Sequence, residues 1–525
     1  MKPLHSVLSL TVLSFVGCGR FASLPPVVPL PSFGHEAAKI LPDAPVMSDD
    51  SDDTVDTTIP ARYQGIHTSS LTWKAPLLSS YADTLLPGVV VFWVPDSTLP
   101  LASLQISWPE GRLALGPRDA AAASLLGGLL RRGGAGAFTP AKLDDTLEFL
   151  AAHVSVSVGA VRSSASAGGL ARDLPFLLDL VGDVLTAPRL DTARVSTAIE
   201  EHIQDIEHQM DTPAQTLGLA WDRLSYGPSA WTRLSDSTVV RSLKVNDFRR
   251  VLAGRFSGSK AWISVAGRYD KAATRQRILS LMDRLRHGPS SKPAVARLDS
   301  IAPVPQLPAK GVWVYDIPAN QTQIRLGARF PKRDDPDYYP LMLASEVLGQ
   351  GGFGSRLVDR VRSDEGLAYH VSSFVGSDYD RQSMLGVGLQ TKVQSTGRAL
   401  KLVFEEINRL RDSGFRAGEL SKAREGLSAS VPSLFDSPEG IADLVLQSAA
   451  WGRHDDHFGR YLRALDTIPD TTVLRVFRKW FVPESMRVVV SGPADVLSKP
   501  FADGSPALST YGPVSVWNAD TLRMR

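Results

Sequence analysis

The chain repeats one order of strand-like and helix-like segments, and this repetition restricts its fold more than any other feature. The first copy closes with KAWISVAGRYD (260–270), and the second closes with MRVVVSGPAD (486–495), one domain length further along. Solenoid repeats are only about 20 to 50 residues long, so a repeat of this size indicates a duplicated domain. We therefore expect two tandem homologous domains of similar length.

Each copy mixes strands with helices, which predicts an α+β fold in which each half is a sheet with packed helices. Apolar and alternating runs predict the strands, and longer periodic runs predict the helices. The predicted strands are 89–94, 101–108, 153–167 and 260–270 in the first half, and 323–330, 367–374 and 486–495 in the second; the predicted helices are 120–132, 140–152, 337–348 and one from 355 onward.

Composition sets the expected boundaries of these two domains. Residues 286–310 are Pro-rich and of low complexity, as is typical of a linker. The first domain is then expected at 71–285 and the second at 311–498. Residues 499–525 are expected to form a C-terminal tail.

The N-terminus has the features of an export signal. MKPLHSVLSLTVLSFVGCGR has an early Lys and an apolar run too short to span a bilayer, which predicts a cleaved signal peptide at 1–17. Phe15-Val16-Gly17-Cys18 resembles a bacterial lipobox, so Cys18 is the expected lipidation site. The alternative is a plain signal peptide with an incidental cysteine. Gly19 is not the Asp that typically retains lipoproteins in the inner membrane, which favours the periplasmic side of the outer membrane.

Residues 18–70 are rich in Pro, Ser and Asp and are expected to be a disordered tether between the lipid and the folded body. Cys18 is the single cysteine, so no disulfide can form within the chain. Lys and Arg number 57 against 55 Asp and Glu, a formal net charge of +2. This balance argues against a nucleic-acid partner, because no basic excess is present to neutralise phosphates.

The second half carries a recognisable set of motifs. Residues 321–374 contain DPDYY at 335–339, SRL at 355–357, and an Arg362 followed by Gly366-Leu367-Ala368-Tyr369. This segment resembles the C-terminal domain of the insulinase (pitrilysin) family of zinc metallopeptidases. The resemblance extends more weakly over the first half, and it implies two tandem domains of the insulinase type.

The resemblance also implies that the zinc site is degenerate. Active members carry H-x-x-E-H on a helix of the first domain; its two His and a distant Glu bind zinc, and its Glu is the general base. The family register places Ser124, Gly127 and Gly128 on this motif and Asp205 at the distant glutamate. One carboxylate cannot replace three protein ligands, so we expect no metal and no cofactor in this chain.

Other histidines offer only weak metal sites. His202 and His208 lie six residues apart, so on a helix they do not share a face. His202 and Asp205 could share one, although solvated helix-face residues are the simpler interpretation. His454 and His457 have the i, i+3 spacing that can bind a metal, but an exposed loop or helix start explains them as well.

Arg362 and Tyr369 form a second group of candidate site residues, after the degenerate zinc motif. Their spacing, with Gly366 between them, predicts a helix end, a left-handed glycine and the start of a strand. In the family, an Arg and a Tyr at this spacing reach toward the zinc and hold substrate carbonyls or the developing oxyanion, which suits a fixed cation and a phenol donor. Without the resemblance, Arg362 would be a surface residue and Tyr369 a core aromatic.

The segment GQGGFGS (349–355) lies where the family has a Gly-rich turn. Its glycines Gly349, Gly351, Gly352 and Gly354 are expected to border a substrate cavity. A dinucleotide-binding loop is a poor interpretation, since no βαβ unit precedes the segment.

The chain keeps the Arg–Tyr pair and lacks the zinc-binding motif. This arrangement is found in one subunit of heterodimeric members of the family. We therefore expect a non-catalytic, zinc-less subunit of a bacterial heteromeric peptidase. Zinc is expected in a partner subunit of the same family, and the substrate is expected to be a peptide or unfolded protein. The alternative is a catalytically dead structural or peptide-binding envelope protein without a peptidase partner. An independent peptidase using unrelated residues is a third interpretation.

Overall fold

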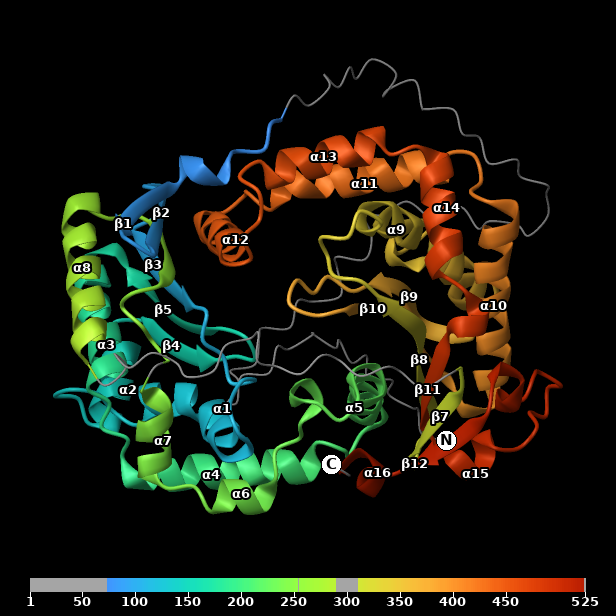
Figure 1. The fold of residues 1–525 in the computed structure, drawn as a ribbon, viewed down its shortest axis with the longest axis horizontal. Helices are drawn as coiled ribbons and strands as arrows, with labels where there is room; N and C mark the ends of the chain where they lie inside the picture. The colour runs from blue at the N-terminus through green and yellow to red at the C-terminus, as the bar shows by residue number, and fades with distance from the viewer. Residues whose placement is uncertain (1–72, 254, 289–309, 524–525) are drawn as a thin grey trace, which may run out of the picture. The chain divides into compact units, whose positions relative to one another are not determined.

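A computed structural model describes residues 73–253, 255–288 and 310–523. Each half forms one six-stranded sheet. Helices pack against each sheet (Figure 1). The fold is therefore the predicted pair of tandem α/β-layer domains. The expected signal peptide, Cys18, the tether and most of the linker lie outside the described residues.

The first half contains six strands and eight α-helices among the described residues. In chain order they are β1 (Ala82–Leu86), β2 (Val89–Pro95), β3 (Leu101–Trp108), α1 (Pro117–Arg132), α2 (Pro140–Phe149), β4 (His153–Val158), β5 (Ser163–Leu170), α3 (Leu174–Thr186), α4 (Thr192–His208), α5 (Pro213–Tyr226), α6 (Ser237–Arg241), α7 (Val245–Leu252), β6 (Ala261–Gly267) and α8 (Lys271–His287).

The second half repeats this plan and adds two π-helical segments, η8 and η9. In chain order its elements are β7 (Val312–Asp316), β8 (Gln321–Phe330), α9 (Tyr338–Ser345), η8 (Glu346–Gln350), η9 (Val358–Asp364), β9 (Ala368–Val375), β10 (Ser383–Lys392), α10 (Thr396–Ser413), α11 (Glu419–Ser433), α12 (Pro438–Ala450), α13 (His457–Thr467), α14 (Asp470–Trp480), β11 (Arg487–Gly492), α15 (Ala494–Leu497), β12 (Val514–Trp517) and α16 (Ala519–Arg523).

The two sheets have matching strand orders, β1-β2-β6-β3-β5-β4 and β12-β7-β11-β8-β10-β9. In each sheet the last long strand, β6 or β11, inserts between a parallel and an antiparallel neighbour. These are the strands of the two repeated segments that close the halves. The sheets differ at one edge: β1 pairs antiparallel with β2, whereas β12 pairs parallel with β7.

Sequence periodicity explains how α1 and β4 pack together. Ala122, Leu126, Leu129 and Leu130 of α1 are fully or almost fully buried and recur at the spacing of one helix face. Strand β4 alternates exposed and buried residues, with its valines facing the core. The apolar stripe of α1 therefore lies against the buried face of the sheet's edge strand.

Each half also covers part of the other half's sheet. Helix α5 packs on β8 and β11, where Leu217, Trp221 and Leu224 are buried with aromatic residues of β7. Helix α12 packs in turn on β2, β3 and β6. This exchange of helices gives each sheet a second covered face and joins the two halves through apolar contacts.

Two predicted elements differ from the structure. The single strand expected at 153–167 is a hairpin of β4 and β5, because the chain turns where the Gly159 N–H donates to the Arg162 carbonyl at 2.8 Å. The tail expected at 499–525 instead supplies β12, so the second sheet extends to Trp517. None of the described helices is long and apolar enough to cross a membrane.

Candidate functional site

Helix α1 carries the positions of the degenerate zinc motif, and Gly127 has a packing role there. Gly127 is buried, and a Cβ added to it would lie 2.5 Å from the carbonyl oxygen of Val156 in β4. A glycine inside a helix costs about 1 kcal/mol relative to alanine, but here it allows α1 to approach the strand backbone closely. A glutamate base at this position would collide with β4.

The two positions that would carry histidines are exposed. The Ser124 hydroxyl donates a hydrogen bond to the Ala121 carbonyl at 2.7 Å, one turn back in α1. A Cβ added at Gly128 would lie 3.6 Å from Nη2 of Arg132. Arg132 also pairs with Glu201 of α4, with 2.9 Å between Nη1 and Oε2. This ion pair thus joins α1 and α4, the two helices that carry the positions of the degenerate motif.

Asp205 of α4 is exposed and offers one carboxylate. Its neighbour His202 is half-buried, and burial lowers the pKa of its imidazole, with partial opposition from the charge of Asp205. Over the described ranges, no three His, Cys, Asp or Glu side chains are grouped so as to hold a metal. The residues at the motif positions therefore do not fit a catalytic zinc.

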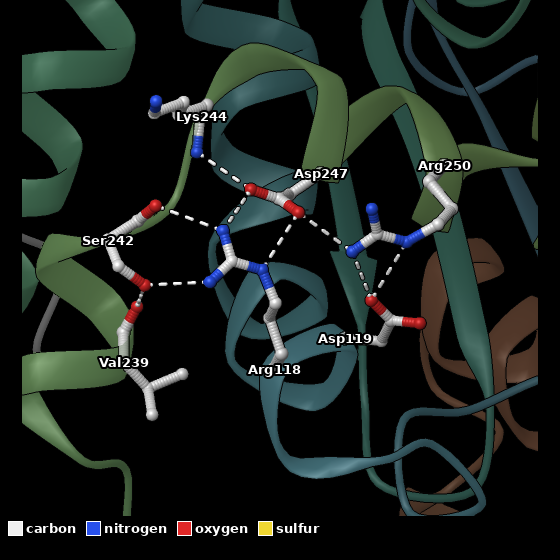
Figure 2. A network of polar contacts seen from close by, with 7 residues as sticks. All are labelled: Arg118, Asp119, Val239, Ser242, Lys244, Asp247 and Arg250. Atoms are coloured by element: carbon white, nitrogen blue, oxygen red, sulfur yellow. Dashed lines mark hydrogen bonds and ion pairs between the residues drawn. The ribbon is translucent and has the colours of Figure 1, made fainter.

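A polar network holds the N-terminal end of α1, as Figure 2 shows. The side chain of Asp247 in α7 is 8% exposed and accepts hydrogen bonds from the guanidinium groups of Arg118 and Arg250. It also accepts one from the Lys244 N–H at 2.9 Å. Arg250 in turn pairs with Asp119 of α1 at 2.6 Å. These contacts attach α1 to α7 by charge pairing.

The same network lowers the pKa of the Asp247 carboxyl well below its ordinary value. The largest cause is the side-chain hydrogen bond from Arg118, and the Lys244 N–H and Arg250 add to it against the effect of burial. Asp247 is therefore ionised at neutral pH, and its charge holds the guanidinium groups of α1 and α7 together.

In the second half, the structure brings Arg362 and Tyr369 together. Gly366 has a φ of +61°, and its N–H donates to the Arg362 carbonyl at 3.2 Å, which ends η9 as predicted. The helix end differs from expectation in being π-helical. The Cζ of Arg362 lies 5.4 Å from the ring centroid of Tyr369 at the start of β9. Tyr369 is 83% exposed, so it is not a core aromatic.

The Gly-rich segment lies beside this pair. Gly349 is buried, and a Cβ there would lie 2.7 Å from the Ser373 nitrogen of β9. Gly351, Gly352 and Gly354 are exposed. Phe353 is 75% exposed, and the Arg362 guanidinium lies 4.8 Å from its ring centroid. Sequence reasoning missed Phe353, although an aromatic residue flanked by glycines was a signal for an exposed ring.

A cavity of about 920 Å³ opens between the start of α5 and the ends of β8 and β10. Its lining is rich in carboxamides, including Gln323 and Gln390, and the loop glycines do not line it. Gln390 is the register partner of His370, the residue after Tyr369. The cavity is therefore lined by a residue of β10 that pairs with β9, the strand that carries Tyr369.

The His454–His457 pair does not form a metal site. Nδ1 of His454 accepts a hydrogen bond from the Asp456 N–H at 3.1 Å. Burial lowers the pKa of His457 to about 4, with a further contribution from nearby arginines, and its ring packs against Phe458 with 5.0 Å between centroids. Each ring thus has a local structural partner.

The duplicated fold and the degenerate motif indicate a peptidase-like class of protein, and comparisons with known proteins show which family it resembles. Residues 242–427 match the family model described as the peptidase M16 inactive domain. This match confirms the resemblance to the insulinase (M16) family inferred from the second-half motifs. No H-x-x-E-H sequence occurs anywhere in its 525 residues.

Bacterial relatives carry contrasting descriptions. An uncharacterized zinc protease of Streptomyces coelicolor is 24% identical over 357 residues, covering 67% of this chain and 72% of that protein. A non-peptidase homolog of Helicobacter pylori is 26% identical over 208 residues, covering 39% and 45%. An uncharacterized zinc protease of Mycobacterium tuberculosis is 24% identical over 294 residues, covering 54% and 64%. The chain thus spans less than two thirds of the last two proteins.

Solved structures share the fold. A peptidase M16 inactive domain from Pseudomonas fluorescens superposes with a TM-score of 0.69 at 22% identity, covering 78% of this chain and 97% of that one. A protease from Helicobacter pylori gives a TM-score of 0.64 at 14% identity, covering 78% and 99%. At these identities the likeness establishes the two-domain architecture.

Proposed function

We propose that this chain is the zinc-less subunit of a heteromeric M16 peptidase. It binds a peptide or unfolded protein and presents Arg362 and Tyr369 to the bond that a zinc-bearing partner subunit cleaves. The inactive-domain match and the absence of H-x-x-E-H support the non-catalytic part of this proposal.

One observation carries the proposal. The Arg362 guanidinium lies over the Tyr369 ring, and within the described part of the chain it has no hydrogen-bond acceptor or ion-pair partner. A cation–π contact needs no hydrogen-bond acceptor, so the N–H groups of the guanidinium remain available to a ligand. The Tyr369 side chain is likewise exposed to solvent.

This arrangement suits the stabilisation of negative charge on oxygen. Cation–π contacts with the Phe353 and Tyr369 rings hold the guanidinium, so its donors are positioned before a carbonyl oxygen gains charge. The phenol of Tyr369 adds a second donor of a different kind. Because both groups act on developing charge, their removal is expected to affect turnover more than assembly.

The test starts from the complex isolated from the native host through a tag on the full chain. The co-isolated protein is sequenced for H-x-x-E-H, the zinc content is measured, and peptide cleavage is assayed. Arg362→Ala or Tyr369→Phe should lower turnover about 100- to 1000-fold, as for the loss of one oxyanion donor. Arg362→Lys should recover only part of the loss, because an ammonium lacks the planar fork.

Arg360→Ala is the matched control. Arg360 belongs to the same π-helical segment but pairs with Glu365, which Arg398 also contacts, so Glu365 keeps a partner in the variant. Full cleavage by Arg362→Ala and Tyr369→Phe complexes of normal composition would contradict the proposal. If no protein with an H-x-x-E-H motif co-isolates with the chain, the alternative of a peptide-binding envelope protein is favoured. The absence of a neighbouring gene that encodes an H-x-x-E-H protein would favour the same alternative.

We also propose that the chain is exported and anchored through Cys18 on the periplasmic side of the outer membrane. The support is the apolar leader and the lipobox-like Phe15-Val16-Gly17-Cys18. A peptidase subunit at this place would meet unfolded or partly degraded envelope proteins.

A further inference from the structure

Phe353 is held in an exposed position by its own loop. It lies between Gly352 and Gly354, whose φ angles of +67° and +85° are in the left-handed region that favours glycine. On one side, the Gly351 N–H donates to the Glu346 carbonyl at 3.0 Å. On the other, the hydroxyl of the buried Ser355 donates to the Gly352 carbonyl at 2.6 Å. The bonds on both sides fix the loop around Phe353.

The cation of Arg362 connects Phe353 with Tyr369. Its Cζ lies 4.8 Å from the Phe353 centroid and 5.4 Å from the Tyr369 centroid. Both rings are largely exposed, at 75% and 83%. Two aromatic rings in water beside a guanidinium without an acceptor offer an apolar surface and hydrogen-bond donors at one place.

From this cluster we propose that Phe353, Arg362 and Tyr369 form a peptide subsite in which Phe353 selects a large apolar side chain. The Arg362 N–H groups bind a carbonyl of the same peptide, and the Phe353 ring covers the neighbouring side chain. The inference builds on the proposed function and adds to it the class of substrate side chain that this site takes.

The cluster suits a peptide better than a second subunit. A stable subunit interface buries roughly 1,600 Å² in total, whereas an aromatic side chain contributes at most about 250 Å². Two rings and one cation therefore cover a single side chain and its peptide group. Burying one large apolar side chain strengthens binding by roughly 10- to 150-fold, which is enough to select among peptides.

The test uses the isolated full chain and short fluorescein-labelled peptides that differ only in a central Leu, Phe or Gly, with binding measured by fluorescence polarisation. Phe353→Ala should weaken binding of the Leu and Phe peptides about tenfold and leave the Gly peptide nearly unchanged. Phe353→Leu should keep most of the preference, because a large apolar surface remains.

Phe149→Ala is the matched control, since Phe149 is 88% exposed and lies on α2 in the first half. Phe149→Ala should leave the affinities for all three peptides unchanged. Equal weakening of all three peptides by Phe353→Ala, or no weakening, would overturn the subsite. So would a Phe353→Ala chain that loses its partner subunit but keeps its preference, because the residue would then belong to the subunit interface.

These outcomes separate the subsite from the proposed function. If the isolated chain prefers apolar peptides through Phe353 but no zinc-bearing partner exists, the peptidase proposal fails and the subsite stands. If Arg362 and Tyr369 variants reduce cleavage in the complex while Phe353→Ala leaves peptide selection unchanged, the subsite fails and the peptidase proposal stands.

Discussion

The hydroxyls of Thr216 and Ser491 share a buried hydrogen bond of 2.5 Å, although 275 positions separate the two residues. Thr216 belongs to α5 of the first half and Ser491 to β11 of the second. The bond lies where α5 crosses the second sheet, beside the apolar contacts of Leu217 and Trp221. Because α12 makes the reverse contact on the first sheet, we expect the two halves to unfold together.

The Thr216–Ser491 pair allows a direct test of that coupling. Thr216→Val should lower the free energy of unfolding by about 1 to 3 kcal/mol, because it leaves the buried Ser491 hydroxyl without its partner. Ser491→Ala should cost less, because the Thr216 hydroxyl keeps its hydrogen bond to the Thr212 carbonyl at 3.1 Å. The double variant should lose less free energy of unfolding than the sum of the losses in the two single variants. Urea unfolding followed by fluorescence gives the three values, and strict additivity would show that the hydroxyls are not coupled.

Two adjacent glycines in α1 should respond in opposite directions. Gly127→Ala places a Cβ 2.5 Å from the Val156 carbonyl oxygen and should cost about 1 to 3 kcal/mol, as overpacking does. Gly128→Ala has no contact shorter than 3.6 Å and should stabilise the chain by up to about 1 kcal/mol. Thermal unfolding of the two variants measures both effects. Equal responses would contradict the close approach of α1 to β4.

The purified chain is expected to hold no stoichiometric zinc after dialysis against a chelator. Ser124 and Gly128 supply no imidazole, and Asp205 alone cannot hold the ion. Atomic absorption on the dialysed protein decides this, and one retained zinc per chain would contradict the expectation. Ser124→His, Gly128→His and Asp205→Glu together should restore binding, whereas Gly127→Glu should unfold the chain through its collision with β4.

Much of the fold was predictable from the sequence because the duplication repeats strong signals. The closing strands β6 and β11 are continuous apolar runs, and the helix and strand around Gly366 follow from one motif. The hairpin of β4 and β5 was missed because its polar alternation continues across the turn at Gly159. Strand β12 was missed because a four-residue strand between turn residues leaves no clear pattern.

The candidate site was predictable in part. The resemblance located Arg362 and Tyr369, but the exposure of Tyr369 depends on β9 being the edge strand of its sheet. The position of Phe353 depends on the backbone angles of two glycines, which the sequence does not specify. The Arg132–Glu201 pair joins different helices, and its geometry follows only from how α1 and α4 pack.

Cys18 is expected to determine where the protein is found in the cell. Cys18→Ala should move the chain from the membrane fraction to the soluble periplasmic fraction, because the thiol that accepts the lipid is lost. Fractionation with metabolic labelling by a radioactive fatty acid measures this. An unlabelled wild-type chain in the soluble fraction would instead indicate a plain signal peptide.

The pH dependence of stability should show the charge of Asp247. Its folded-state pKa is lowered, chiefly by Arg118, so its stabilisation is complete above the ordinary Asp pKa of about 3.9 and is lost as the pH falls below it. Asp247→Asn should therefore be less stable than the wild type by about 1.5 to 3 kcal/mol at pH 7, and this difference should shrink in acid. Asp205→Asn, which changes an exposed carboxyl outside this network, is the control and should not lower the stability at pH 7 by a comparable amount. Urea unfolding at a series of pH values measures the three proteins, and parallel curves for the wild type and Asp247→Asn would show that this carboxylate does not hold α1 to α7.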